Sequence, residues 1–105
     1  MKTFHQIWLS AEREADARKI LEGLTAKKLI VGGSLMRAPS HFWWKGKEIN
    51  LAEYCYVMAF SVGSRRPEIE AEYAKLSTEE IPMASFVTFE GNEKFLAYIA
   101  ENTDI

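Results

Sequence analysis

The chain has very little of what cross-links or anchors a protein. Cys55 is its only cysteine, so no intrachain disulfide can form and nothing requires an oxidising compartment. No apolar run approaches the length of a membrane span, and the first residues lack the apolar stretch and small-residue cleavage site of a signal peptide. These features predict a cytoplasmic protein without a membrane partner.

The chain also lacks an excess of charge of either sign. Its formal net charge is −2, from 13 Lys and Arg against 15 Asp and Glu, and the basic residues are scattered rather than gathered into a stripe. Binding to a phosphate backbone needs a basic surface, so we expect no nucleic-acid partner. Repeats and linkers are absent as well. Because 105 residues leave room for one core, residues 1–105 are expected to form a single domain.

The hydrophobic pattern predicts the element order β-α-β-β-α-β-α. Ser10 is expected to cap the first helix, Pro67 to start the second, and Gly91-Asn92 to open the third, in which Phe95 and Ile99 face inward. This order is that of the split βαβ, or ferredoxin-like, α+β fold, an antiparallel sheet with helices on one face. The predicted strands span residues 4–9, 29–44, 53–62 and 81–89.

The adjacent residues Trp43 and Trp44 are the most informative feature that is present. Successive strand side chains point to opposite faces of a sheet, and a small single-layer sheet offers only one dry face. One indole is therefore expected in the core of the chain and the other against a neighbouring subunit, because aromatic residues are enriched in interfaces. In an alternative arrangement, one indole lines a pocket between subunits beside Glu48 or Glu80.

Metal ligands are few in this sequence. Soft and borderline ions prefer thiolate, thioether and imidazole ligands, and the chain has no CxxC, HxH or HExxH pattern. If Lys45-Gly46 is a two-residue turn, counting along the hairpin places His41 opposite Asn50 and Met36 opposite Cys55. The last pair would form a partial site for cuprous ion. The alternative is that Cys55 is a buried small hydrophobe and Met36 fills a gap.

The second predicted strand is interrupted twice. Gly32-Gly33 are expected to form a bulge, and Pro39 a break or an edge position. A phosphate-binding loop would precede a helix, whereas these glycines enter a strand, so nucleotide binding is not expected at this point.

Three segments resemble the CutA family of divalent-cation tolerance proteins. They are Phe-Trp-Trp-Lys-Gly-Lys at 42–47, Glu-Ile-Pro at 80–82 and Glu-Gly-Asn-Glu-Lys-Phe-Leu-Ala-Tyr-Ile at 90–99. The family typically has Tyr-Trp-Trp-Glu-Gly-Lys, then His-Pro-Tyr-Glu-Val-Pro, then Glu-Gly-Asn before an aromatic-leucine helix. The resemblance extends over nearly the whole chain. It implies a ferredoxin-like homotrimer, built like the PII signalling proteins, that binds copper or other divalent metals and has no established catalytic activity.

The chain departs from this family at two positions credited with holding metal. The cysteine that the family has near Val31 or Gly32 is missing, and Ser77 stands at the histidine of the His-Pro-Tyr-Glu motif. The metal candidates are therefore Glu80, His41 and Cys55. The candidates for the subunit interface or cleft are Trp43, Trp44 and Glu48.

The residues and the resemblance together predict a non-enzymatic, trimeric binding or scaffold protein with copper or another divalent metal as its ligand. Neither His5 nor His41 belongs to a recognisable catalytic arrangement. A PII-like regulator that binds a small anionic metabolite or nucleotide at the subunit interface is the alternative. A third class, a small cofactorless oxygenase, would need an acid–base constellation that the sequence does not offer.

Overall fold

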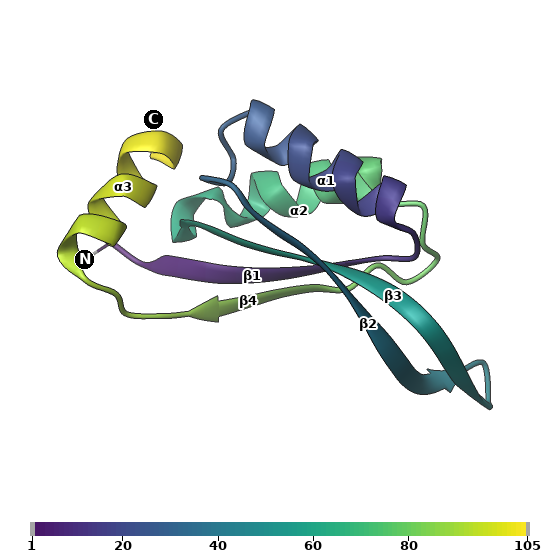
Figure 1. The fold of residues 1–105 in the computed structure, drawn as a ribbon. Helices are drawn as coiled ribbons and strands as arrows, with labels where there is room; N and C mark the ends of the chain where they lie inside the picture. The colour runs from purple at the N-terminus through teal and green to yellow at the C-terminus, as the bar shows by residue number, and fades with distance from the viewer. Residues whose placement is uncertain (1, 105) are drawn as a thin grey trace.

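A four-stranded antiparallel sheet with three α-helices makes up the computed structural model, which describes residues 2–104 (Figure 1). The elements are β1 (Phe4–Ala11), α1 (Glu14–Ala26), β2 (Gly33–Trp44), β3 (Lys47–Val62), the 3-10 helix η1 (Gly63–Arg65), α2 (Arg66–Leu76), β4 (Ala84–Thr88) and α3 (Glu93–Thr103). The strand order is β2-β3-β1-β4, so β2 and β4 are the two edges. The predicted ferredoxin-like α+β fold is confirmed. Within the described residues, no helix is long and apolar enough to cross a membrane.

Helices α1 and α2 cover one face of the sheet (Figure 1). Alternate side chains of β1, including Ile7 and Leu9, are fully buried in one cluster with Ile20 and Leu24 of α1 and Ile69 of α2. The alternation follows from strand geometry, because successive side chains point to opposite faces. Burying each such side chain contributes about 1.5–3 kcal/mol, so this layer is the main core.

Helix α3 packs at the end of the sheet that lies away from the β2–β3 hairpin (Figure 1). Its Ile99 is fully buried in a second cluster with Phe4 and Val62, and the rings of Phe95 and Phe60 lie 5.1 Å apart. Along β1 and β3, these positions alternate with those beneath α1 and α2, so α3 covers one end of the second face. The predicted inward orientation of Phe95 and Ile99 is confirmed.

The β2–β3 hairpin extends beyond the body and makes the molecule elongated, with dimensions of 43 × 24 × 20 Å (Figure 1). Lys45 and Gly46 form the predicted two-residue turn, with φ angles of 49° and 79°. Both angles are positive, as a type I′ hairpin turn requires. At the base of the hairpin, a Cβ on Gly33 would lie 2.1 Å from the carbonyl oxygen of Met58, so only glycine permits this close pairing.

Two predictions about the second strand are wrong. β2 begins at Gly33 rather than at residue 29, and the ladder shows no bulge at the glycines; its register shift lies between Ala38 and Ser40, at the break predicted for Pro39. Pro39 lies at the shift, because proline has no N–H to give to the ladder. Between the shift and the body, each β2 residue is therefore paired one position further along β3 than counting from the turn predicts.

The prediction that Ser10 caps the first helix is also wrong. Ser10 lies in β1 opposite Tyr56, and α1 has Arg13 as its N-cap residue, whose side chain makes no capping hydrogen bond. The hydroxyl of Ser10 instead accepts the N–H of Met83 at 3.0 Å. Met83 belongs to the connection after α2, so β4 itself is shorter than predicted and runs only over Ala84–Thr88.

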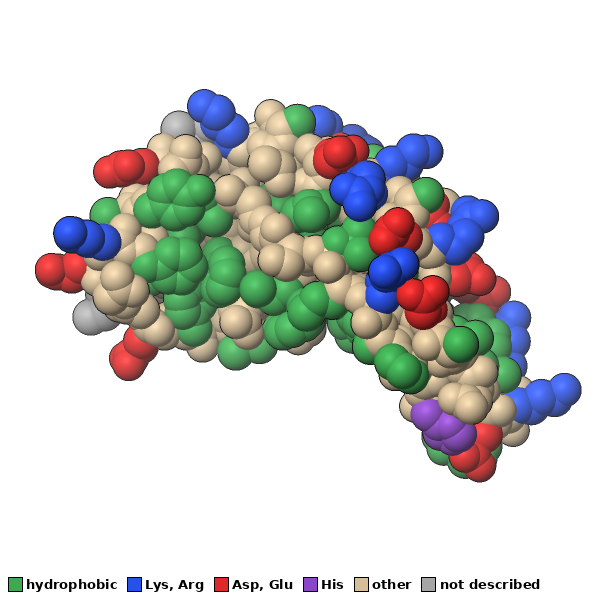
Figure 2. Space-filling view, viewed as in Figure 1, with side chains coloured by type: hydrophobic (Ala, Val, Ile, Leu, Met, Phe, Trp, Pro, Cys, Tyr) green, Lys and Arg blue, Asp and Glu red, His purple; other side chains and the backbone are tan. Residues whose placement is uncertain are grey.

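Several large apolar side chains stay exposed. Figure 2 shows hydrophobic side chains gathered over the front of the body and on the protruding hairpin. The exposed large hydrophobic residues are Trp43, Ile81, Met83, Val87 and Tyr98. Three of them, Ile81, Met83 and Val87, belong to the β4 edge strand or to the segment that leads into it.

Candidate functional site

The two tryptophans lie near the tip of the hairpin. Trp43 is paired with Glu48 and Trp44 with Lys47, so the two indoles leave opposite faces of the ribbon. Trp43 is 71% exposed, whereas Trp44 is half-buried, with the Lys45 ammonium 5.5 Å from its ring centroid. The expectation that one indole lies in the core of the chain is wrong, because the hairpin carries both of them beyond the layer covered by α1 and α2.

His41 and Glu48 form a direct contact across the hairpin. His41 lies opposite Asn50, as predicted, and its Nε2 is 2.6 Å from Oε2 of Glu48. A carboxylate oxygen can only accept, so the imidazole donates this hydrogen bond. Glu48 is also the cross-strand neighbour of Trp43. These three side chains therefore form one exposed group on the hairpin.

Glu80 approaches the hairpin from the body. It lies in the connection between α2 and β4, and its Oε1 is 3.4 Å from Nζ of Lys45. This contact places Glu80 next to Trp44, because the same ammonium lies over the Trp44 ring. The sequence left open whether an indole lies beside Glu48 or beside Glu80. Within one protomer both arrangements occur at separate places, with Trp43 beside Glu48 and Trp44 beside Glu80.

Cys55 lies away from both neighbourhoods. It is 3% exposed and belongs to the core beneath α1 and α2. Burial raises the pKa of its thiol, and the nearby Glu53 carboxylate adds to this effect, so the thiolate that a metal needs is disfavoured. The predicted Met36–Cys55 pair is wrong, because the shift at Pro39 sets Met36 opposite Tyr56 and Cys55 opposite Arg37. Cys55 is the buried small hydrophobe of the alternative interpretation.

The three metal candidates are not brought together. Cys55 is in the core, His41 contacts Glu48, and Glu80 contacts Lys45. Among residues 2–104, no group of three or more His, Cys, Asp or Glu side chains is placed to hold an ion. Copper needs soft or imidazole donors that converge. The donor set of one protomer therefore does not fit the copper site that the CutA resemblance implies.

A part-buried polar cluster, which sequence analysis missed, ties the body to the segment that carries Glu80. Ser10 donates to Glu79 at 2.6 Å, Tyr54 donates to the other oxygen of Glu79, and Tyr73 donates to the carbonyl of Ser10 at 2.7 Å. Burial raises the pKa of Tyr54, and its hydrogen bond to Glu79 raises it further. No spacing signal links residues so far apart in sequence. The cluster holds Glu79, and with it the adjacent Glu80, against β3 of the hairpin at Tyr54.

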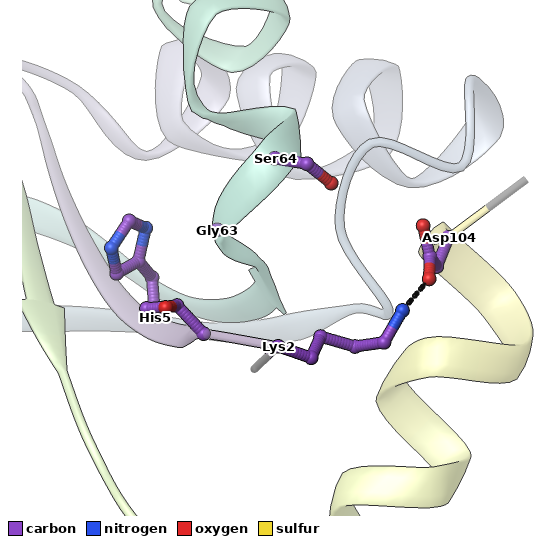
Figure 3. A pocket seen from close by; sticks show the side chains of 6 residues that line it. Lys2, His5, Gly63, Ser64 and Asp104 are labelled. Carbon is purple, nitrogen blue, oxygen red and sulfur yellow. Dashed lines mark hydrogen bonds and ion pairs between the residues drawn. The ribbon is translucent and has the colours of Figure 1, made fainter.

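A separate shallow depression lies at the opposite end of the molecule (Figure 3). Its volume is about 680 Å³, and Lys2 and Asp104 form an ion pair at its rim. His5 also lines it, and the Nδ1 atom of this residue has no hydrogen-bond partner among the described residues. Burial, and then the charge of Arg66, lower the pKa of His5. None of the predicted site residues is among those that line it, which are Lys2, Thr3, His5, Gly63, Ser64 and Asp104.

Several solved structures have the same fold. The CutA1 protein from Ehrlichia chaffeensis superposes with a TM-score of 0.88 at 17% identity and covers 98% of this chain and 97% of its own. The periplasmic divalent cation tolerance protein CutA from Archaeoglobus fulgidus gives 0.87 at 24% identity, over 98% and 99%. The divalent cation tolerance protein from Thermus thermophilus gives 0.88 at 20% identity, over 95% and 98%. At these identities, the likeness establishes the fold.

Family membership comes from a separate comparison. No curated protein matches the chain. The family model of the CutA1 divalent ion tolerance protein, however, matches residues 5–102, which is nearly the whole sequence. The chain belongs to the CutA1 family of divalent ion tolerance proteins.

Proposed function

We propose that the protein is a non-enzymatic, homotrimeric binding protein of the cytoplasm that serves divalent-metal tolerance, with its binding cleft between subunits. The observation that carries the proposal is Trp43, which is 71% exposed on a hairpin that projects beyond the body. A Trp side chain can bury about 150–250 Å² when it is covered. Trp is also among the residues that most often dominate the binding energy of an interface. An indole left this exposed in one protomer is well suited to contact another copy.

The sheet edges support the same assembly. β2 and β4 are both edge strands, and edge N–H and C=O groups can pair with another chain. Ile81, Met83 and Val87 provide exposed apolar side chains along the β4 side. Pairing between the long β2 edge of one copy and the β4 edge of the next would cover both edges, and a repeated head-to-tail contact gives a closed trimer when each copy is rotated by one third of a turn from the last.

The cleft would then use ligands from more than one copy. Within one protomer, His41 and Glu48 are together, and Glu80 is held by Lys45. A metal ion, copper included, would therefore need these side chains to be completed by a neighbour. A nucleophilic enzyme is disfavoured, because burial raises the pKa of the Cys55 thiol, and the Ser10 hydroxyl donates to a carboxylate rather than to an imidazole.

Native mass spectrometry with elemental analysis, on protein purified without chelator, tests assembly and metal together. We expect a trimer in the wild type and smaller species for Trp43→Ala and Trp44→Ala. Tyr98→Ala is the matched control, because Tyr98 is an exposed aromatic residue on α3 at the other end of the molecule, and it should leave the trimer intact. A monomeric wild type, or unchanged assembly in both tryptophan variants, would contradict the proposal.

A second proposal is supported by the charge at the tip. Lys45 in the turn and Lys47 directly after it both lie beside Trp44, and a cation next to an aromatic ring suits a small anionic metabolite or nucleotide. This would make the protein a PII-like regulator. A thermal shift with ATP but none with copper would favour the regulator, and the reverse result would favour metal tolerance.

A further inference from the structure

The connection between α2 and β4, residues 77–83, contains no helix or strand, yet it is held at two points. Both carboxylate oxygens of Glu79 accept hydrogen bonds, one from Ser10 at 2.6 Å and one from Tyr54. Further along, the Met83 N–H donates to the hydroxyl of Ser10, and the Met83 carbonyl accepts the Ser10 N–H, both at 3.0 Å. Ser10 is 1% exposed. The side chains of Ser10, Tyr54 and Glu79 thus form a clamp that fixes this connection to the body.

Ile81 lies midway between the two held residues and is 69% exposed. Pro82 comes next, and a proline restricts both its own φ angle and the backbone of the residue before it. An exposed apolar side chain on an irregular segment usually loses conformational freedom when a partner covers it, and this loss weakens binding. The clamp reduces that loss in advance, because the connection is held on both sides of Ile81 before any partner arrives.

Tyr54 links the same connection to the hairpin. It belongs to β3, which pairs with β2 along the hairpin, whereas Glu79 precedes β4. In the sheet β3 and β4 are separated by β1, so the hydrogen bond from Tyr54 to Glu79 joins two segments that the strand order keeps apart. In a head-to-tail contact, the relative placement of the two surfaces within one protomer sets the rotation from copy to copy. The clamp therefore helps to fix the β4 side relative to the hairpin.

We propose that the clamp positions Ile81 as a preordered apolar contact for a second copy of this chain, with Glu79 as the positioning residue. The inference rests on the proposed trimer and deepens it, because it assigns the residues that hold one of its two surfaces ready. A second copy is the occupant because one protomer exposes both halves of the contact. Trp43, 71% exposed, projects on the hairpin, whereas Ile81 and Met83 stay uncovered on the β4 side. A head-to-tail arrangement brings the second surface of one copy to the first surface of the next.

Sedimentation velocity of the full chain over a range of protein concentrations tests the proposal. Tyr54→Phe removes one hydroxyl from the clamp and should raise the concentration at which half of the trimer dissociates by about tenfold, the effect of losing one hydrogen bond to a charged group. The physical reason is that the arrangement competent for assembly becomes less populated. Tyr56→Phe is the matched control, since its ring lies on the same strand, 5.4 Å from that of Tyr54, and within residues 2–104 its hydroxyl makes no hydrogen bond. It should change the dissociation by less than about twofold.

A second background separates positioning from a merely structural role. In Ile81→Ala, which leaves every residue of the clamp in place, Tyr54→Phe should shift the dissociation by less than about twofold, because the side chain that the clamp presents is gone. Hydrogen exchange of residues 79–83 is measured alongside and should rise in Tyr54→Phe but not in Tyr56→Phe.

The two levels of the proposal fail in different ways. A tenfold shift that persists in Ile81→Ala, equal shifts in Tyr54→Phe and Tyr56→Phe, or unchanged exchange of residues 79–83 in Tyr54→Phe would each overturn the role of the clamp. A wild type that forms no trimer contradicts the proposed function instead. A wild-type trimer whose dissociation is the same in Tyr54→Phe contradicts the clamp alone.

Discussion

Side-chain burial differs sharply between the body of the molecule and its hairpin. In the body, apolar residues such as Leu24 are fully buried, and the polar cluster around Ser10 is paired internally. In the hairpin, none of residues 39–52 is buried, and its ion pairs are exposed, with the side chains of Lys45 and Glu80 64% and 61% accessible. The body therefore buries its core within one protomer, whereas the outer part of the hairpin buries none of its side chains.

Because of this difference, the outer part of the hairpin lacks stabilising burial within one protomer. A two-stranded hairpin alone is marginally stable in water, because its ladder lacks the burial that offsets the entropy cost of chain ordering. The strands of 12 and 16 residues gain their support where they join the sheet, and their outer halves have little. A second copy that covers Trp43 would supply the missing burial. The proposed assembly would therefore use the part of the protomer that buries the least of its own surface.

The largest expected effect tests whether stability resides in the body. Leu24→Ala removes a fully buried side chain and should lower the free energy of unfolding by about 2–5 kcal/mol. Trp43→Ala, although the larger truncation, should change it by less than about 0.5 kcal/mol in the dissociated protomer, because the indole is exposed. Urea denaturation at low protein concentration measures both. A comparable loss in the two dissociated variants would remove the distinction between the two regions.

The next effect concerns the polar cluster. Ser10→Ala removes the donor to Glu79 and the acceptor of the Met83 N–H; because the Ser10 side chain is buried and both hydrogen bonds are part-buried, this should cost about 1–3 kcal/mol. Ser64→Ala is the control, because Ser64 is exposed and should change stability by less than about 0.5 kcal/mol. Hydrogen exchange of residues 77–83 should also rise in Ser10→Ala alone. Equal stability of the two variants would show that the cluster does not hold this segment.

The sequence predicted the body better than it predicted the site. Periodicity and the Pro67 and Gly91-Asn92 signals located the elements, because local spacing determines which faces are apolar. Ser10 was misassigned, since a serine before a helix resembles a cap, and only the tertiary structure brings it to Glu79. Such contacts between distant segments leave no pattern along the chain.

The hairpin shows a second limit. Alternation correctly placed the two indoles on opposite faces, and counting from the turn correctly paired His41 with Asn50. Counting residues from the turn failed beyond Pro39, because one extra unpaired residue shifts the register of every following pair between the two strands. Cys55 was therefore assigned the wrong partner. A proline within a strand identifies where such a count becomes unsafe, although it does not indicate which strand gains the residue.

A smaller effect is expected at the far end of the body, where His5 lines the shallow depression. Burial and the charge of Arg66 lower the pKa of His5, so the folded state favours the neutral imidazole. The stabilisation is then complete above the unfolded value of about 6.5 and is lost as pH falls through the lower folded value. The slope should stay below about 1.4 kcal/mol per pH unit. Denaturant midpoints between pH 7 and 5 measure it, and His5→Gln should flatten the curve; an equal slope in this variant would assign the pH dependence elsewhere.

The smallest effect is expected in the hairpin itself. A double-mutant cycle with His41→Ala and Glu48→Ala should give a coupling of about 0.2–1 kcal/mol, because both groups are solvated and the contact competes with water. The Lys27–Glu72 pair of the body, whose N···O distance is 3.0 Å, is the matched control, since its carboxylate side chain is only 13% exposed. The hairpin coupling should be the weaker of the two in the dissociated protomer. If it rises above that of the control when the protein assembles, His41 and Glu48 are desolvated by another copy, and the exposed group becomes part of an interface.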